Sequence, residues 1–276
     1  MKVVSLINMK GGVGKTTLSV NICDCIAKRH GLKVLLVDID PQFNATQCLL
    51  SPEEYITHLK EGKNTILNIF DRAARPVVNS VEGIAEKQPK KLNEIAPVKV
   101  SENFYLLPGN LELFRIEMSP GEGRENRLNK FLQELQKAEA FDIVIIDTPP
   151  TPSIWMTSAL LASNFYLIPV KADPISFTGI DLLQGIINDK KENFDLKIEC
   201  CGVVLTMVEE GTLVYQQAVE FLSKSNWAKY KYARELPKRT AIARNQMSKV
   251  FILDLDDYNG KSALSGIVDE LLQRIN

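Results

Sequence analysis

The sequence has 276 residues, of which 45% are hydrophobic and 24% charged, and its formal net charge is −1. This is the composition of an ordinary globular protein, and no segment approaches the ~20 consecutive apolar residues of a membrane-spanning helix. A net charge near zero excludes an overall field that would draw the chain to nucleic acid or to a membrane. Five cysteines, an odd number, argue against a disulfide framework, so we expect buried, reduced thiols.

Short apolar runs rich in β-branched residues alternate with longer amphipathic segments along the chain. Continuous apolar runs of this length are typical of parallel strands covered on both faces. The pattern predicts strands at 3–7, 34–37, 105–107, 143–146, 166–170 and 203–205, and helices at 16–28, 124–137, 175–188, 212–224 and 262–275. It indicates one α/β domain over residues 1–276, with a doubly wound, mostly parallel sheet and helices on both faces.

Residues 51–100 are the least regular part of the sequence. They contain four prolines and a polar stretch at 86–91. Prolines at this density interrupt both helices and strands. We therefore expect surface helices and loops that decorate the sheet and do not form a separate domain.

A glycine-rich turn, Lys-Gly-Gly-Val-Gly-Lys-Thr-Thr at residues 10–17, separates the first expected strand from the first expected helix. Its three glycines permit backbone angles that present N–H groups to phosphate oxygens, and the helix N-terminus adds partial positive charge. Lys15 is expected to reach the β- and γ-phosphates, and the Thr16 hydroxyl to bind Mg²⁺. Gly-Lys-Thr in this context predicts a P-loop that binds ATP.

The residues just before the glycines depart from the general P-loop pattern. Met9 stands where the first glycine is expected, and a second lysine, Lys10, follows it. Lys10 is either a solvated surface lysine or a cation drawn to the bound phosphates, where Coulomb attraction is largest.

Three aspartates follow apolar runs in the sequence. Asp38 and Asp40 come at the end of the second expected strand, and Asp147 ends the fourth. The carboxyl ends of neighbouring parallel strands converge on the ligand crevice of such a sheet. Asp147 is then placed to hold Mg²⁺ through water, and one aspartate of the 38/40 pair can position the attacking water. The alternative is that each aspartate only caps a following turn.

These motifs together resemble the ParA/MinD group of deviant Walker ATPases, and within it the ParA-type, Soj-like DNA-partition ATPases. The likeness extends over nearly the whole chain and is carried by segments 10–17, 37–46, 106–109, 141–150 and 168–170. Nine residues precede the loop at 10–17, as in the branch without an N-terminal helix-turn-helix domain. The sequence departs from the family pattern at Phe43, where glycine is usual, at Ser158, where asparagine is usual, and at Ala243, where proline is common.

The resemblance implies a role for each site residue. Lys10 would cross to the partner's nucleotide in an ATP-bound sandwich homodimer, and Lys10, Lys15 and Asp40 would form the catalytic set, with Asp40 orienting the hydrolytic water. Magnesium would be held by Thr16, Asp38 and Asp147. The implied nucleotide contacts are Lys10, Gly11, Gly12, Val13, Gly14, Lys15, Thr16, Thr17, Met207 and Asn245, of which Met207 and Asn245 resemble residues that contact the adenine.

The stretch from Lys224 to Lys249 carries eight Lys and Arg residues against one acid, Glu235. A local excess of this size in a net-acidic chain is typical of a surface that contacts nucleic-acid phosphates. The DNA contacts that we would test first are Arg234, Lys238, Arg239 and Arg244. The alternative is a solvated face whose cations have acidic neighbours in space.

The function expected from these features is an ATP-hydrolysing, Mg²⁺-dependent partition protein for a plasmid or chromosome, with weak intrinsic hydrolysis. Its ATP-bound homodimer would bind DNA without sequence preference. A ParB-like centromere-binding protein would stimulate ATP hydrolysis and so release the dimer from DNA. We expect a cytoplasmic, nucleoid-associated protein.

Of two other functions on the same scaffold, one remains as the alternative and the other is rejected. A MinD-like membrane-positioning ATPase needs a basic amphipathic C-terminal helix, whereas Asp269 and Glu270 place acid near this end, so we expect no membrane partner. An iron-sulfur reductase resembling the nitrogenase iron protein needs cysteines in glycine-rich ligand loops, which this sequence does not offer.

Overall fold

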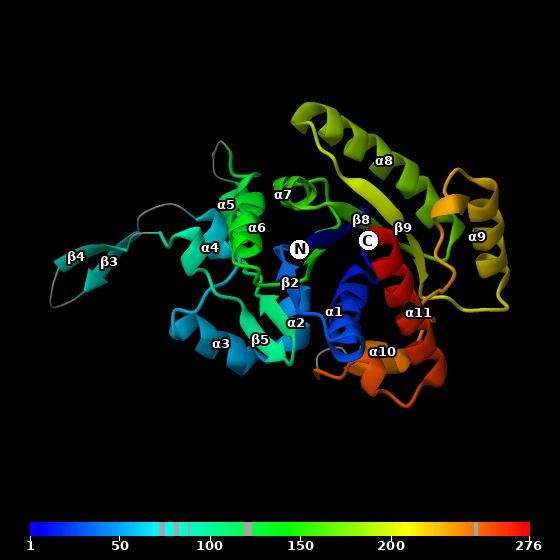
Figure 1. Cartoon of the computed structure of the whole chain (residues 1–276), viewed down its shortest axis with the longest axis horizontal. Coiled ribbons are helices and arrows are strands. Elements are labelled where there is room, and N and C mark those ends of the chain that lie inside the picture. Colours follow the sequence, from blue (N-terminus) through cyan, green and yellow to red (C-terminus); the bar gives the residue numbers. More distant parts are fainter. Residues whose placement is uncertain (72–74, 80–82, 88, 119–122, 246–247) are drawn as a thin grey trace.

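In the computed structural model, seven strands of the described chain form one sheet in the order β5-β6-β2-β7-β1-β8-β9 (Figure 1). The structure describes residues 1–71, 75–79, 83–87, 89–118, 123–245 and 248–276, except for the side chains of 75–79, 83–87, 174, 175, 178 and 243–245. The strands are β1 (Lys2–Leu6), β2 (Val34–Asp38), β5 (Val98–Ser101), β6 (Phe104–Leu107), β7 (Ile143–Asp147), β8 (Phe165–Lys171) and β9 (Glu199–Thr206).

All neighbours in this sheet are parallel except β5, which pairs antiparallel with β6 at the edge. The predicted fold class, a doubly wound and mostly parallel α/β sheet, is confirmed. Each of the six predicted apolar runs coincides with a strand, although the first extends one residue beyond the end of β1 at Leu6. The reason is burial on both faces, since every residue of β2 and of β7 is buried.

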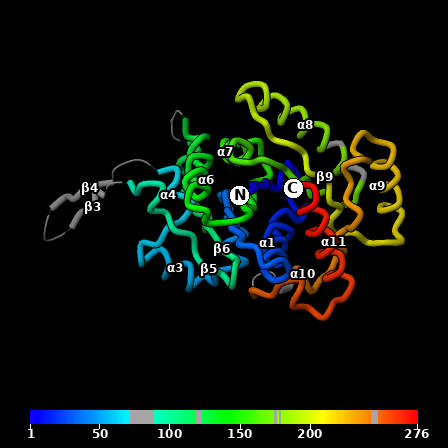
Figure 2. Tube along the Cα trace, in the orientation of Figure 1, coloured from blue at the N-terminus to red at the C-terminus, as the bar shows by residue number. Residues whose placement is uncertain are grey.

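Helices cover both faces of the sheet. One face packs against α1 (Lys15–Cys25), which continues as a π-helical turn over Ile26–His30, and against α2 (Asn44–Leu49) and α11 (Tyr258–Ile275). The other face packs against α4 (Leu67–Phe70), α5 (Leu113–Glu117), α6 (Arg127–Lys137), α7 (Ile154–Ala162), α8 (Pro174–Phe194) and α9 (Leu213–Lys224). The tube in Figure 2 follows this path from β1, in blue, to α11, in red.

The alternation of side chains along the strands divides the core in two. Val4 and Leu6 of β1 point to the face with α1 and α11, whereas Val3 points to the face with α6 and α7. Successive side chains of a strand point to opposite faces, so a continuous apolar run fills both halves of the core. The predicted C-terminal packing helix is α11, and its buried residues include Leu264, Ile267, Val268, Leu271 and Ile275.

The region 51–100 is more ordered than the sequence indicated. It contains the expected surface helices, α3 (Pro52–Lys60) and α4, and a 3₁₀ turn at Leu92–Glu94. It also contains three strands that we did not expect: β5, and an antiparallel hairpin of β3 (Arg75–Asn79) and β4 (Gly83–Lys87) apart from the main sheet. The prediction of helices and loops alone was wrong here, because β5 is a short, half-exposed edge strand without the apolar pattern of a buried one.

Short elements complete the C-terminal part. α10 (Thr240–Asn245) lies in orange beside α1 in Figure 1, and 3₁₀ turns occur at Ala228–Tyr230 and Ile252–Asp254. The described cysteines are all free thiols, as expected, and only Cys200 is not fully buried.

Candidate functional site

The glycine-rich loop lies between the end of β1 at Leu6 and the start of α1 at Lys15. Gly12 and Gly14 have φ of 70° and 78°, the left-handed region that other residues rarely adopt, and Gly14 is the N-cap of α1. This conformation lets the chain turn sharply from strand to helix with its backbone open to a ligand. The predicted strand-loop-helix context of a P-loop is therefore present.

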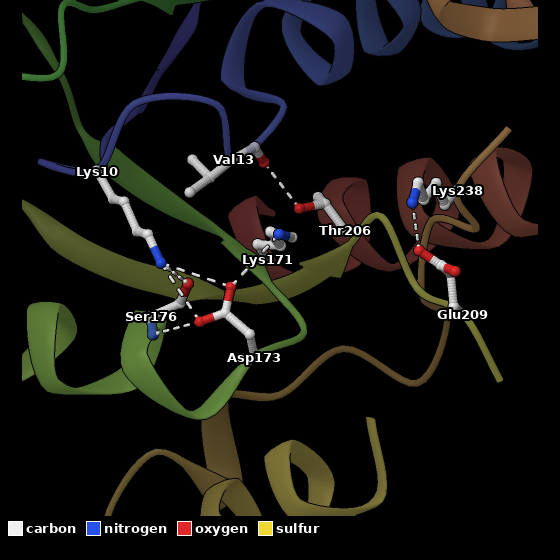
Figure 3. Close-up of polar contacts among 8 residues, drawn as sticks. All are labelled: Lys10, Val13, Lys171, Asp173, Ser176, Thr206, Glu209 and Lys238. Atoms are coloured by element: carbon white, nitrogen blue, oxygen red, sulfur yellow. Dashed lines mark hydrogen bonds and ion pairs between the residues drawn. The ribbon is translucent and has the colours of Figure 1, made fainter. Parts of the chain in front are cut away.

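Neighbouring strands anchor the loop. The Asn8 side-chain amide donates to Pro169 O at 2.7 Å, and its oxygen accepts from Lys10 N at 2.8 Å. On the other side, Thr206 Oγ1 donates to Val13 O at 2.7 Å (Figure 3). The loop is thus fixed to β8 and β9 before any ligand binds, which lowers the ordering entropy that binding costs.

A cavity of about 460 Å³ opens above the loop. Its lining brings together the predicted residues of the loop, the aspartate proposed to orient water and one of the two predicted adenine contacts: Gly11, Gly12, Val13, Gly14, Lys15, Thr16, Thr17, Asp40 and Met207. Sequence reasoning did not assign five further lining residues: Gln42, Asn44, Gln47, Cys48 and Pro150. Their signal was their position in the segments that follow β2 and β7, including α2, because the segments at the carboxyl ends of parallel strands form the crevice.

Lys15 is a buried cation at the floor of this cavity. Its side chain donates to the carbonyl oxygens of Asn8 at 3.0 Å and Lys10 at 3.3 Å. Burial lowers the pKa of Lys15, and the nearby carboxylates of Asp147 and Asp40 oppose this shift. A desolvated ammonium held by carbonyls gains from an entering anion, which is the role expected of a P-loop lysine.

Asp147 lies directly beneath the first turn of α1. Its carboxylate accepts from Thr16 Oγ1 at 2.7 Å and from Ser19 Oγ at 3.0 Å. In the sheet, Asp147 lies between Leu6 of β1 and Asp38 of β2, its register partners. Burial raises the pKa of Asp147 to about 6, although the hydrogen bond from Thr16 and the charge of Lys15 oppose the shift.

Asp38 is fully buried beside it. One oxygen, Oδ2, accepts from the Thr46 backbone N at 2.8 Å and from the Thr46 hydroxyl at 2.7 Å. The other, Oδ1, has no hydrogen-bond partner among the described residues. Burial, and next the charge of Asp147, raise the pKa of Asp38 well above its usual range.

These residues fit a magnesium ion. A hydroxyl and carboxylates are ligands that Mg²⁺ prefers, and an unpartnered buried oxygen on Asp38 leaves room for one further interaction. Within the described chain, no three His, Cys, Asp or Glu residues gather closely enough to form a metal cage. Mg²⁺ in nucleotide sites is typically held by one or two protein groups, with water and phosphate oxygens completing the shell. Thr16, Asp147 and Asp38 can provide this kind of site.

Asp40 lies on the rim of the cavity, two residues after β2. Its Oδ1 accepts from Gln42 N at 2.9 Å, and its backbone oxygen accepts from Phe43 N at 2.8 Å. Burial raises the pKa of Asp40, while the hydrogen bond from Gln42 opposes this. The turn therefore fixes the carboxylate at the cavity wall.

Lys10 does not line the cavity. Its ammonium lies 3.3 Å from Asp173 Oδ1 and donates to Ser176 Oγ at 2.9 Å (Figure 3). Asp173 is the N-cap of α8, where its Oδ1 also accepts from Ser176 N at 2.9 Å. The Lys10 ammonium thus lies at the start of α8, away from the residues that line the cavity, although the Lys10 backbone oxygen accepts from Lys15.

The basic stretch from Lys224 to Lys249 has acidic neighbours, two of them local in sequence and three from elsewhere in the fold. Five of its eight cations form ion pairs: Lys224–Glu220, Lys231–Glu235, Lys238–Glu209, Arg239–Asp257 and Lys249–Glu54. Figure 3 shows the pair of Lys238 with Glu209. Of the predicted DNA contacts, Arg234 is exposed and forms no ion pair within the described part of the chain. The side chains of Arg244 and of Asn245, the second predicted adenine contact, lie outside the described residues.

Comparison with known proteins decides the family. A family model described as "AAA domain" matches residues 1–200. The sporulation initiation inhibitor protein Soj of Bacillus subtilis is 33% identical over 248 residues, which cover 88% of this chain and 85% of the relative. The chain belongs to this ATPase family, in its ParA/MinD branch. The predicted resemblance is therefore confirmed.

Two further matches extend over almost the full chain. The chromosome-partitioning ATPase Soj of Thermus thermophilus is 27% identical over 276 residues, covering 99% of this ParA/MinD-type chain and 96% of the relative. A plasmid partition protein of Borrelia burgdorferi, solved with bound AMPPNP, superposes with a TM-score of 0.73 at 22% identity and covers 99% of both chains. No helix in the described residues combines the length and apolarity that a membrane crossing demands.

Proposed function

We propose that this protein is a Mg²⁺-dependent ATPase that partitions a plasmid or chromosome. The observation that carries the proposal is the meeting of three features at one cavity: the open glycine-rich loop, the buried ammonium of Lys15 and the carboxylate of Asp40. The partition function of the Soj relative from Thermus and of the Borrelia protein supports the biological role.

In this proposal different residues bind the phosphates, the magnesium ion and the base of ATP. Backbone N–H groups of the loop and the N-terminus of α1 receive the phosphates of ATP, and Lys15 pairs with the β- and γ-phosphates. Thr16, Asp147 and Asp38 hold Mg²⁺, which, when bound, neutralises phosphate charge. Met207 contacts the base side of the nucleotide, since its side chain lies over Gly14 at the cavity edge.

Hydrolysis is assigned to Asp40. Its carboxylate is held at the cavity wall by Gln42 N, so it can accept a hydrogen bond from water and orient it toward the γ-phosphorus. Lys10 lies outside its own cavity, which is consistent with a role at the nucleotide of a second copy in an ATP-bound homodimer. Positioning and electrostatic stabilisation account for nearly all catalysis of phosphoryl transfer, so an intrinsically slow ATPase is expected until the dimer is complete.

The ATP-bound and ATP-free states differ in DNA binding. The ATP-bound dimer binds duplex DNA without sequence preference through Arg234, Lys238, Arg239 and Arg244, and it associates with the nucleoid. A ParB-like centromere-binding protein stimulates hydrolysis and releases the dimer. Surface cations suit this task, because phosphate contacts supply most of non-specific affinity and can be reversed when the dimer separates.

The deciding experiment measures binding of the purified protein to random-sequence duplex DNA with ATP, ADP or no nucleotide, across a salt series. Binding with ATP alone and a steep fall with salt supports the proposal. The Lys15→Ala variant serves as the control, since it removes the phosphate-binding cation and should show no ATP effect. Binding to anionic vesicles with ATP, and none to DNA, contradicts the DNA-partition proposal and favours a membrane-positioning ATPase.

A further inference from the structure

Phe43 has a backbone conformation that its side chain disfavours. It lies at the N-cap of α2 with φ 42° and ψ 40°, the left-handed region. A bulky residue is disfavoured in this region and persists only where neighbouring groups hold it. Strain of this kind occurs most often at functional sites. The residue lies three positions after Asp40 and closes the turn that carries it, by donating from its N–H to Asp40 O.

The ring of Phe43 is held by Tyr55. The two rings stack with centroids 5.3 Å apart and an interplanar angle of 21°. Tyr55 belongs to α3, a helix outside the sheet, which begins at a full capping box between Ser51 and Glu54. α3 therefore holds Tyr55 in place. Through the stack, Tyr55 fixes the ring of Phe43 and with it the turn that carries Asp40.

A second path leads from Tyr55 to Asp38. The Tyr55 hydroxyl donates to Gly109 O at 2.9 Å, and Gly109 N donates to Thr46 Oγ1 at 2.7 Å. Thr46 then donates both its hydroxyl and its backbone N–H to Asp38 Oδ2. Burial and the nearby charge of Asp38 raise the pKa of Tyr55 to about 12, so the phenol remains a donor at neutral pH.

Close packing at Gly109 joins the two paths. A Cβ at this position would lie 2.6 Å from Phe43 Cβ and 3.0 Å from the Asp38 carboxylate, so only glycine fits. The residues around it therefore pack closely against one another, so a shift of one displaces its neighbours. The nucleotide cavity is lined by Gln42 and Asn44, on either side of Phe43, and the lining residues in the described chain do not include Phe43 or Tyr55.

We infer that Tyr55 is a positioning residue for ATP hydrolysis, which acts on Asp40 through the ring of Phe43 and on Asp38 through Gly109 and Thr46. This inference rests on the proposed ATPase function. Because Tyr55 supports the acidic groups and does not line the cavity, it affects turnover more than nucleotide affinity. A helix of the region that sequence reasoning treated as decoration thus belongs to the hydrolytic apparatus.

The test compares steady-state ATP hydrolysis and ATP affinity of the 276-residue protein and four variants. Tyr55→Phe keeps the stack and removes one hydrogen bond, so kcat should fall about 2–10-fold while the ATP Kd changes less than two-fold. Tyr55→Leu removes both paths and should lower kcat further. Phe43→Gly relieves the backbone strain but removes the ring, so it should also lower kcat. Ile56→Ala, an exposed neighbour on α3, is the matched control and should leave kcat and Kd unchanged.

Hydrogen exchange of the nucleotide-free protein gives a readout that does not depend on turnover. Tyr55→Phe should speed exchange of the backbone amides of Thr46 and Gly109 and leave those of α1 unchanged. Equal kcat and equal exchange in Tyr55→Phe and wild type would overturn the inference, as would a Phe43→Gly variant that is more stable and fully active. If Tyr55→Leu does not fold, Tyr55→Phe decides. A wild-type protein without any ATPase activity would instead refute the proposed function, and this inference with it.

Discussion

Lys10 and Asp173 form an ion pair within one chain, and the same lysine donates to Ser176 (Figure 3). The partners lie 163 positions apart in sequence, at the loop before α1 and at the N-cap of α8. In the proposed dimer, Lys10 must leave this position to reach the nucleotide of the second copy. The intrachain pair therefore opposes dimerisation by the free energy needed to separate it.

Asp173→Asn removes the charge and keeps the cap, because asparagine is as good an N-cap as aspartate. Partly exposed ion pairs contribute about 0.2–1 kcal/mol each. Because dimerisation separates this pair in both copies, we expect the variant to dimerise with ATP at up to about 30-fold lower protein concentration. Sedimentation equilibrium with and without ATP measures this. Asp189→Asn, an exposed position on the same helix, is the control for loss of one negative charge.

Lys10→Ala should have the opposite effect on dimerisation. It should bind ATP with an affinity close to that of wild type, because Lys10 does not line the cavity. It should remain monomeric with ATP, because the proposed contact to the second nucleotide is lost. An ATP-dependent dimer of this variant would remove the assignment of Lys10 to the interface.

Asp40→Ala should bind ATP and lose hydrolysis by about 100-fold or more, because positioning and activation of the attacking water are lost. The variant should accumulate as an ATP-bound dimer that stays on DNA. A filter-binding assay for ATP and a phosphate-release assay measure the two properties separately. Normal turnover in Asp40→Ala would show that another group orients the water.

Arg234 should matter more for DNA binding than Lys238 or Arg239. The latter two already pair with Glu209 and Asp257, whereas Arg234 forms no ion pair in the described chain. Arg234→Ala should weaken binding several-fold and lower the slope of log affinity against log salt by about one per chain. Fluorescence anisotropy with a DNA duplex over a salt series measures both. Lys224→Ala, whose cation pairs with Glu220, is the control. An equal loss in Lys238→Ala and Arg234→Ala would contradict this ranking.

Asp24 should make stability depend on pH. Burial raises the pKa of Asp24 to about 6, against the opposing effect of Lys28, whose ammonium lies 3.0 Å away. The folded state thus binds the Asp24 proton more tightly than the unfolded state does. The stabilisation that comes from this proton is fully present below the unfolded pKa and is lost as pH rises through about 6. Asp24→Asn should therefore be more stable than wild type at pH 8, by about 1–3 kcal/mol, and the difference should shrink toward pH 5.

Urea denaturation at pH 5, 6.5 and 8 measures the effect. Asp254→Asn is the matched control, because Asp254 pairs with the same lysine at 2.8 Å. Burial is the largest single effect and tends to raise the pKa of Asp254, but the hydrogen bonds from Lys28 and Phe251 N, together with the nearby positive charges, lower it overall. This substitution should thus destabilise the protein at pH 8. A gain in Asp24→Asn that is independent of pH would contradict the prediction.

The sequence predicted those parts of the fold and site that depend on neighbouring residues. The buried strands appeared as apolar runs, and the loop at 10–17 was recognisable because its glycines, lysine and threonine are adjacent. The edge strand β5 was missed because it depends on antiparallel pairing with β6 and lacks the continuous apolar run of a buried strand. The neutralisation of Lys238 by Glu209 and the support of Asp38 by Thr46 and Gly109 were not predicted either, since they arise from side chains that only the fold brings together.

Asp38 of β2 lies opposite Asp147 of β7, and Leu6 of β1 lies on the other side of Asp147. Side chains alternate between the two faces of a sheet, so a slip of one residue in β2 or β7 would turn its carboxylate away from the other. Such a chain could still bury its apolar runs and retain the circular dichroism of an α/β protein. Nucleotide binding would be lost all the same, so ATP affinity, and not helix or strand content, is the measure of whether a preparation has reached its native strand register.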